Sequence, residues 1–263
     1  MSSTSILNLH QVELTYPGRD SLVQALAEIS INVTAGEFIC IVGPSGCGKT
    51  SLLKIIAGFI QPTAGEVLMD GRRITEPAAD RGMVFQQPAL YPWLNVADNV
   101  AFGLRMRGLQ GRDRVHRVEA MLDLVGLSDF GRRAPYELSG GMQQRAAIAR
   151  VLINEPRIML MDEPFGALDA LTREHMQEEL LKIWRTTHTT IILITHSVEE
   201  AIYLGTRTLV MSPRPGRIVA DISTPFSREA GESRAIKSRA DFIAIRENVL
   251  EYIWRPSAQP QFQ

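Results

Sequence analysis

This 263-residue sequence has few cysteines, no long apolar run and no excess of charge of one sign. Cys40 and Cys47 are the only cysteines, and the sequence has no CxxC pair or Cys/His cluster, so a structural zinc site is excluded. A disulfide-stapled scaffold is excluded as well, and we expect a reduced, cytosolic compartment. The longest apolar runs, such as residues 38–42, fall far short of the roughly 18 residues that suggest a membrane span.

Charge is balanced, with 28 Lys plus Arg against 29 Asp plus Glu, and 45% of the residues are hydrophobic. These values exclude a disordered chain, a collagen-like chain and a basic chain that coats nucleic acid. The first residues lack the basic start and apolar stretch of a signal peptide, so we expect a soluble protein. The length allows one large domain or two small ones.

Three continuously apolar runs, at residues 38–42, 158–161 and 191–194, predict strands of a parallel sheet that are buried on both faces. Each run stops at polar residues. Ligands of open α/β sheets bind at the carboxyl ends of the strands, so we expect these three polar clusters to converge. Helical patterns occur between the strands, at residues 50–60, 115–125, 143–152 and 172–184. This alternation predicts an α/β fold.

Two further segments have clear patterns. Residues 6–34 alternate between apolar and polar with a period of two, which predicts a small antiparallel β appendage. Near the other end, Phe242, Ile245, Val249 and Ile253 fall on one helical stripe, so we expect a helix over residues 241–254 that packs on the core.

Residues 43–50 read Gly-Pro-Ser-Gly-Cys-Gly-Lys-Thr and match the pattern G-x-x-x-x-G-K-[ST] between a predicted strand and a predicted helix. Glycines let backbone N–H groups close around phosphate oxygens, and the helix N-terminus adds a positive dipole. Lys49 would place its charge at the β and γ phosphates, and the Thr50 hydroxyl would hold Mg²⁺. The sequence therefore predicts binding of a nucleoside triphosphate. The predicted contacts are Gly43, Pro44, Ser45, Gly46, Cys47, Gly48, Lys49, Thr50 and Ser51.

Two other motifs could act on the same ligand. Asp162 and Glu163 end the second predicted strand, where the Asp could hold Mg²⁺ and the Glu could polarise the attacking water. An acidic pair at a strand end is also common without any function. Ser139, Gly140 and Gly141 precede a predicted helix and could expose N–H groups to a phosphate, although an ordinary capped helix fits the same residues.

Taken in order, these motifs resemble those of the ATPase subunit of ABC transporters. The ordered motifs are the phosphate loop, Gln86 after Val84-Phe85, Leu-Ser-Gly-Gly-Met at 138–142, the acidic strand at 158–163, Ala-Leu-Asp at 167–169, and His196. The resemblance implies a P-loop NTPase with a RecA-like core, a small antiparallel β appendage and an inserted helical subdomain. It implies one ABC ATPase domain over residues 1–263, with the helical subdomain at about 88–155 and a C-terminal helical extension at about 216–263.

The resemblance also implies a head-to-tail dimer. In this family the signature residues Ser139, Gly140 and Gly141 would grip the γ-phosphate of ATP held by the partner subunit. Asp169 would lie at the dimer seam. Met142 replaces the glutamine that the family usually has, and we expect altered side-chain contacts to the partner site without loss of ATP binding.

Three isolated residues receive roles from the same resemblance. Tyr16 would stack on adenine, Gln86 would sense Mg²⁺ and water while linking to the permease, and His196 would contact the γ-phosphate. Tyr16 could instead be an edge-strand aromatic, and His196 could be a helix cap. The implied catalytic residues are Glu163, His196 and Gln86. The implied Mg²⁺ ligands are Thr50, Gln86 and Asp162. The residues implied to bind ATP together with the phosphate loop are Tyr16, Ser139, Gly140, Gly141, Asp162 and Asp169.

Four segments narrow the resemblance. Residues 162–170 and 212–218, the latter reading Ser-Pro-Arg-Pro-Gly-Arg-Ile, are similar to the nitrate, sulfonate and taurine importer group. Residues 231–238 and 242–250 are similar to its taurine branch. The implied function is the ATPase of an importer for a small anionic or zwitterionic solute, such as taurine or another sulfonate. Its implied position is peripheral, on the cytoplasmic face of the bacterial inner membrane.

The implied partners are a second copy of the chain, integral-membrane permease subunits and a periplasmic solute-binding protein, with no nucleic acid. Tyr91, Trp93 and Phe102 would face the permease, although Phe102 fits the subdomain core better. The alternative is a non-transport ABC ATPase that regulates an envelope complex or acts in DNA repair or translation. A last expectation concerns Cys47: its place near Lys49 and a helix N-terminus predicts a more reactive thiol than Cys40.

Overall fold

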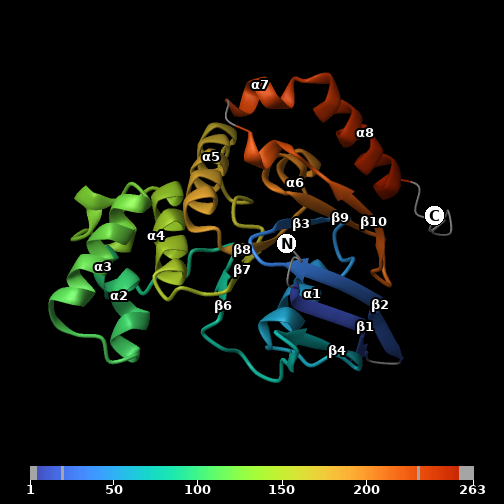
Figure 1. The fold of residues 1–263 in the computed structure, drawn as a ribbon, viewed down its shortest axis with the longest axis horizontal. Helices are drawn as coiled ribbons and strands as arrows, with labels where there is room; N and C mark the ends of the chain where they lie inside the picture. Colours follow the sequence, from blue (N-terminus) through green and yellow to red (C-terminus); the bar gives the residue numbers. More distant parts are fainter. Residues whose placement is uncertain (1–4, 19–20, 230–231, 255–263) are drawn as a thin grey trace. The chain divides into compact units, whose positions relative to one another are not determined.

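The computed structural model describes residues 5–18, 21–229 and 232–254 (Figure 1). Two compact units make up the chain: Met1–Ala78 together with Thr190–Gln263, and Ala79–Thr189. Gly231, the first residue of the taurine-like segment 231–238, lies outside the described residues.

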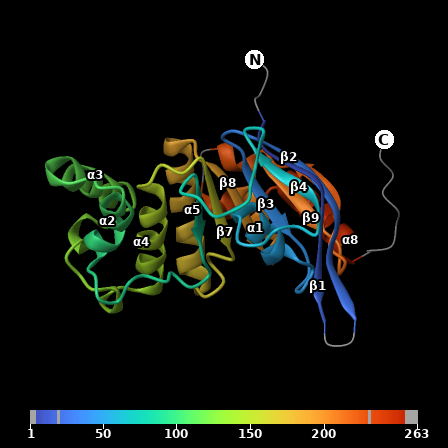
Figure 2. The same cartoon turned by 90° about the horizontal axis from the view of Figure 1, so that it is seen from below.

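An antiparallel sheet of the first unit has the strand order β2-β1-β4-β5. Its strands are β1 (Ser5–Pro17), β2 (Leu22–Thr34), β4 (Ala64–Met69) and β5 (Arg72–Arg73). Figure 2 shows β1, β2 and β4 side by side. Alternate residues such as Leu7 and Leu9 are buried, which is why the period of two correctly predicted this appendage.

Parallel strands form the second layer of the first unit. The central strand β3 (Phe38–Val42) pairs in parallel with β8 (Thr190–Thr195) and β9 (Arg207–Met211), and β10 (Ile218–Ser223) is antiparallel to β9. Every residue of β3 and β8 is buried, as their continuous apolar runs predict. The helices of this unit are α1 (Lys49–Ala57), α6 (Val198–Leu204), α7 (Ser233–Lys237) and α8 (Ala240–Trp254).

The end of the chain packs on the first unit as its apolar stripe predicts. Phe242 and Val249 of α8 are buried, and the ring centroid of Phe242 lies 5.1 Å from that of Phe226 in the short 3₁₀ helix Phe226–Arg228. A helical extension was expected from about residue 216. Residues 218–223 instead form the strand β10, which pairs with β9, and the helices follow it.

The second unit joins two parallel strands, β6 (Arg81–Val84) and β7 (Ile158–Asp162), to four helices. The helices are α2 (Val96–Met106), α3 (Gly111–Leu124), α4 (Gly140–Leu152) and α5 (Ala170–Thr187), with 3₁₀ turns at Ser128–Phe130 and Pro135–Glu137. Helix α2 packs against α3 and α4. It is absent from the helical patterns above because the fully buried Asn99 interrupts its apolar stripe.

None of the helices within the described ranges is both long enough and apolar enough to cross a bilayer.

Candidate functional site

The phosphate loop runs from the end of β3 to the start of α1 and leaves no room for side chains at Gly43 and Gly48. Gly46 and Gly48 have φ angles of +75° and +103°, the left-handed region that favours glycine. A Cβ on Gly48 would lie 2.5 Å from Cδ2 of Leu26, and one on Gly43 would lie 2.8 Å from the carbonyl oxygen of Met211. The loop therefore rests directly on its neighbouring strands.

Lys49 is the buried cation of this loop. Its Nζ donates to the carbonyl oxygens of Gly43 at 2.7 Å and Pro44 at 3.0 Å, so the loop folds around the ammonium group. Helix α1 begins after Gly48 without a side-chain cap and has no acidic residue in its first turn. Its N–H groups and dipole thus meet no competing carboxylate there, and the residues fit the phosphates of a nucleotide.

Tyr16 of β1 lies beside the beginning of α1. Its hydroxyl is 3.1 Å from Oγ of Ser51, so the structure brings these two predicted nucleotide contacts together. The side chain is 36% exposed, which leaves part of the ring open to a ligand. Stacking of Tyr16 on adenine stays a prediction.

His196 follows β8 at the same edge of the sheet as the phosphate loop. The parallel register pairs Val42 of β3 with Thr195 of β8. Gly43 and His196 directly follow these paired residues at the ends of their strands. The reading of His196 as a helix cap is wrong, because Ser197 caps α6 by accepting a hydrogen bond from the N–H of Glu200 at 3.3 Å. His196 is exposed at this edge, and the capping role belongs to Ser197.

Gln86 and Glu163 come together in the second unit. The register of β6 and β7 pairs Val84 with Met161, so both residues follow their strands at one edge. A Cβ placed on Gly166 would lie 3.2 Å from Nε2 of Gln86 and 3.8 Å from Oε2 of Glu163. These two side chains therefore reach the same small volume, beside the end of the strand that carries Asp162.

The signature residues head α4. Ser139 is the N-cap, and its Oγ accepts a hydrogen bond from the N–H of Met142 at 3.3 Å. A Cβ on Gly141 would lie 2.9 Å from Cγ2 of Thr172, so this glycine permits close packing of α4 against α5. The capped helix is thus present, and phosphate binding by Ser139, Gly140 and Gly141 stays a prediction.

Asp169 caps the neighbouring helix α5. One of its carboxylate oxygens accepts a hydrogen bond from the N–H of Thr172 at 3.0 Å. Hydrogen bonds from Thr172 also lower the pKa of the Asp169 carboxyl group. The residue is therefore held as an anion at a helix N-terminus, and its place at a dimer seam stays a prediction.

The strand-end clusters converge within each unit. Gly43, Ser51, Tyr16 and His196 gather around the phosphate loop of the first unit. Gln86, Asp162 and Glu163 gather at the ends of β6 and β7 in the second unit. Convergence of one unit's cluster with the other's stays a prediction.

Both cysteines are buried, and the greater reactivity expected of Cys47 stays a prediction. The side chain of Cys47 is 1% exposed, and its Sγ lies 3.8 Å from Nζ of Lys49 within the phosphate loop. Burial, followed by the charge of Glu200, raises the pKa of the Cys40 thiol well above its ordinary value. Cys47 thus helps to fill the loop, and solvent reagents reach it only when the loop opens.

The loop at residues 212–217 supports the phosphate loop, a contact that the motifs do not reveal. The N–H of Gly216 donates to the carbonyl oxygen of Ala25 at 2.9 Å, and a Cβ on Gly216 would lie 2.0 Å from the carbonyl oxygen of Cys47. Nη2 of Arg214 lies 3.5 Å from the carbonyl oxygen of Gly46. The sequence signal for this contact was Gly216, which follows two prolines and precedes a strand. The family resemblance alone did not explain this pattern.

Residues 88–95 precede α2 and carry Tyr91 and Trp93, which were expected to face the permease. We name them the docking segment after that expectation. The ring centroid of Tyr91 lies 5.4 Å from that of Trp93 and 4.6 Å from that of Phe102. Trp93 is 76% exposed, whereas Phe102 is only partly exposed. The preference for Phe102 as a packing residue therefore agrees with the structure, and Trp93 is the exposed aromatic of this segment.

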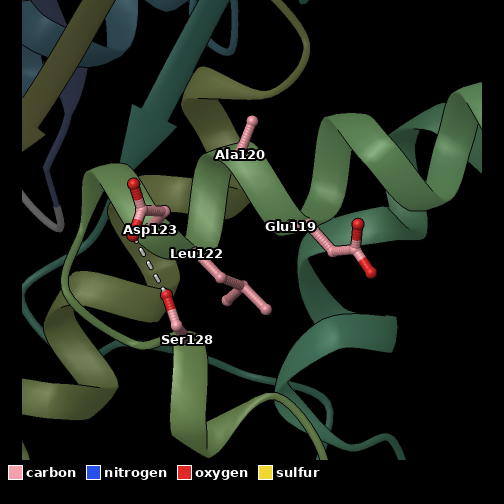
Figure 3. Close-up of a pocket in the computed structure, with 5 residues that line it drawn as sticks. All are labelled: Glu119, Ala120, Leu122, Asp123 and Ser128. Atoms are coloured by element: carbon pink, nitrogen blue, oxygen red, sulfur yellow. Dashed lines mark hydrogen bonds between the residues drawn. The ribbon is translucent and has the colours of Figure 1, made fainter.

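A hollow of about 350 Å³ lies in the second unit, between α3 and the 3₁₀ turn that follows it. Figure 3 shows the residues that line it. Its lining includes Glu119, Leu122 and Asp123, and Oγ of Ser128 donates to Asp123 at 3.3 Å. None of the predicted site residues lines this hollow.

A glycine-rich loop that joins a buried parallel strand to a helix, with its lysine held by the loop carbonyls, defines a P-loop nucleotide-binding protein. The chain belongs to the ABC transporter family, whose model matches residues 26–166. Binding of ATP and its hydrolysis follow from this membership.

The chain is similar to relatives over almost its whole length. It is 54% identical to the taurine import ATP-binding protein TauB of Roseobacter denitrificans, over 97% of this chain and 95% of the relative. It is 52% identical to the protein of the same name from Burkholderia thailandensis, over 95% of this chain and 97% of the relative.

Solved structures agree with the fold. The dimeric structure of MJ0796, a bacterial ABC transporter cassette, matches with a TM-score of 0.73 and 34% identity, over 83% of this chain and 99% of the cassette. The structure of cbiO1 from Clostridium perfringens, part of the ABC transporter complex cbiONQ, matches with a TM-score of 0.76 and 26% identity. That match covers 93% of this chain and 95% of cbiO1.

Proposed function

We propose that the chain is the ATPase subunit of an importer that takes up taurine or another sulfonate. The observation that carries this proposal is the identity of 50% or more with several taurine import ATP-binding proteins over most of the chain. The segments 212–218 and 242–250, which suggested this group, lie outside residues 26–166, the part that the family model matches.

The phosphate loop would bind the triphosphate. Lys49 would place its charge at the β and γ phosphates while the N–H groups of the loop and of α1 surround the phosphate oxygens. Its hydrogen bonds to loop carbonyls support this, because they hold the ammonium group at the centre of the loop before any ligand arrives. Tyr16 would stack on the base, with its hydroxyl already fixed by Ser51.

Hydrolysis would depend on Glu163, Gln86 and His196. Glu163 would accept a proton from the attacking water, Gln86 would orient that water, and His196 would donate to the γ-phosphate. The common reach of Gln86 and Glu163 toward Gly166 supports their acting on one water molecule.

Mg²⁺ would be held by Thr50, Gln86 and Asp162, whose hydroxyl, amide and carboxylate oxygens are the donors this ion prefers. It would supply charge neutralisation at the β and γ phosphates.

Two copies of the chain would assemble head to tail, with the signature residues Ser139, Gly140 and Gly141 of each completing the ATP site of the other. The dimeric cassette among the similar structures supports assembly as a dimer. Asp169, held as an anion at the start of α5, would lie at the seam between the two copies.

The dimer would sit as a peripheral complex on the cytoplasmic face of the bacterial inner membrane, bound to permease subunits. The docking segment, which begins two residues after Gln86 and carries the exposed Trp93, would meet the permease. A periplasmic protein would deliver the solute to the other side of the permease. The multisubunit complex that contains cbiO1 supports the permease contact.

The test is ATPase activity in liposomes that contain the chain, its permease and its solute-binding protein. Adding binding protein loaded with taurine should raise ATP hydrolysis, and Gln86→Ala should weaken this stimulation more than it weakens ATP affinity. Arg117→Ala, an exposed change on α3 outside the proposed site, serves as the control. Full ATPase activity of the isolated chain, with no response to permease, binding protein, sulfonate or nitrate, would favour a regulatory ATPase.

A further inference from the structure

Arg150, on the last turns of α4, holds the docking segment by its backbone. Its Nη1 donates to the carbonyl oxygen of Ala89 at 2.9 Å, and its Nη2 donates to that of Pro88 at 3.3 Å. Its guanidinium carbon lies 5.2 Å from the centroid of the Tyr91 ring. Both terminal nitrogens of the Arg150 guanidinium group and its planar face therefore contact the same short segment.

Asn99 of α2 holds the same segment from a second side. Its Oδ1 accepts from the N–H of Tyr91 at 2.7 Å, and its Nδ2 donates to the carbonyl oxygens of Tyr91 and Leu94 at 3.1 Å each. Asn99 is fully buried, so breaking these bonds would leave polar atoms without partners. The docking segment is thus fastened to two helices by side chains.

Helix α2 and the C-terminal end of α4 also pack closely against each other. Nδ2 of Asn154 donates to the carbonyl oxygen of Arg150 at 2.9 Å, and a Cβ on Gly103 of α2 would lie 2.1 Å from Oδ1 of Asn154. Nη1 of Arg107 also donates to the carbonyl oxygen of Asn154 at 3.2 Å. Helix α2, the C-terminal end of α4 and the docking segment therefore form one packed body.

Arginine is costly at this position. Burial lowers the pKa of Arg150, which shows that the charged guanidinium has lost part of its hydration. No carboxylate is among its bonded partners described above, only carbonyl oxygens and a ring face. A partly desolvated cation that holds backbone carbonyls is suited to positioning a segment, because it fixes the path of the chain without requiring a particular side chain there.

We propose that Arg150 is a positioning residue that makes the docking segment move with α4, so that closure of the signature end on ATP displaces Trp93. Ser139 and Arg150 lie near opposite ends of α4, eleven residues and therefore about 16.5 Å apart along the helix axis. A helix transmits displacement along its length only if both ends are attached to what moves. This inference rests on the proposed dimer that closes on ATP. It adds Arg150 as the residue that transmits this closure to the surface proposed to meet the permease.

The test is hydrogen exchange of the Tyr91 and Leu94 amides in the full-length chain, measured with and without MgATP. A Glu163→Gln background keeps ATP bound. We expect ATP to change the exchange rate of these amides by about 5-fold or more, the lower end of allosteric coupling. In Arg150→Ala this ATP-dependent change should disappear while ATP affinity and dimer formation persist. Arg150→Lys, which can reach one carbonyl only, should retain part of it.

Arg145→Ala is the matched control, because Arg145 lies on the same helix but donates to the carbonyl oxygens of Val125 and Gly126. It should keep the full ATP-dependent change. A role of Arg150 in folding alone would raise exchange equally with and without ATP, which contradicts the inference. An undiminished response in Arg150→Ala also overturns it. If the parent forms no dimer with ATP, the proposed dimer fails, and the inference fails with it.

Discussion

Glu163 adopts a φ angle of +44°, in the left-handed region that non-glycine residues rarely occupy. Its carbonyl oxygen accepts a hydrogen bond from the N–H of Gly166 at 3.1 Å, which closes a tight turn after β7. Such backbone conformations persist where the surrounding structure fixes them, and they are concentrated at functional sites. At the scale of a single residue, the turn therefore fixes the direction of the Glu163 carboxylate.

Replacing Glu163 by Gln should keep ATP binding and lower ATP hydrolysis by about 10²- to 10⁴-fold, the usual loss when a general base is removed. ATP-bound dimer should then accumulate, which size-exclusion chromatography with MgATP would detect. Glu155→Gln is the control, because Glu155 also has a positive φ angle, of 56°, in the same unit. An unchanged rate in Glu163→Gln would remove this residue from the mechanism.

At the scale of elements, the loop at residues 212–217 connects β9 to β10 and lies between the phosphate loop and β2. The N–H of Ala27 donates to the carbonyl oxygen of Gly216 at 3.0 Å, and that of Gly216 donates to Ala25 at 2.9 Å. Oγ of Ser212 accepts from the N–H of Arg217 at 3.1 Å and closes the loop on itself. The phosphate loop thus has a rigid neighbour on this side.

Gly216→Ala should therefore weaken ATP binding, since its Cβ would lie 2.0 Å from the carbonyl oxygen of Cys47 and force the phosphate loop to shift. Overpacking of this kind costs about 1–3 kcal/mol. Calorimetry would report the ATP dissociation constant and the melting temperature. Gly131→Ala is the control, because its Cβ would meet the flexible side chain of Leu122 at 3.1 Å. Unchanged binding and stability in Gly216→Ala would contradict a supporting role.

The elements also show what sequence patterns could and could not predict. The continuous apolar runs of β3, β7 and β8 predicted buried parallel strands, because burial on both faces excludes polar residues. The phosphate loop was predictable because its glycines and Lys49 are adjacent in sequence. The contact of Gly216 with Cys47 was not, since it joins residues far apart in the chain. Helix α2 was missed because Asn99, its buried polar residue, bonds to a loop and breaks the helical pattern.

At the scale of the whole molecule, each chain has two candidate phosphate-binding ends, the start of α1 and the start of α4. Each end is a helix N-terminus with glycines in or next to its first turn, and neither has an acidic residue in that turn. In the proposed head-to-tail dimer the two ends bind different ATP molecules, because the signature end completes the site of the partner subunit. Activity should then require one intact end from each of two chains.

Mixing two inactive variants tests this central claim most directly. Lys49→Ala removes the phosphate-loop cation, and Gly140→Asp adds a negative charge where the partner's γ-phosphate would bind. The aspartate should not disturb the fold, because acidic residues stabilise helix N-termini and the Cβ would lie 3.4 Å from Leu168. Each variant alone should be inactive.

An equal mixture of the two variants should recover about a quarter of the parent ATPase rate per chain, since half of randomly paired dimers are mixed and each has one intact site. The measurement is phosphate release by the purified mixture at concentrations where the parent is active. Recovery near this level confirms that each ATP site is shared between two chains. Activity of either variant alone, or no recovery on mixing while mixed dimers form, would contradict the account.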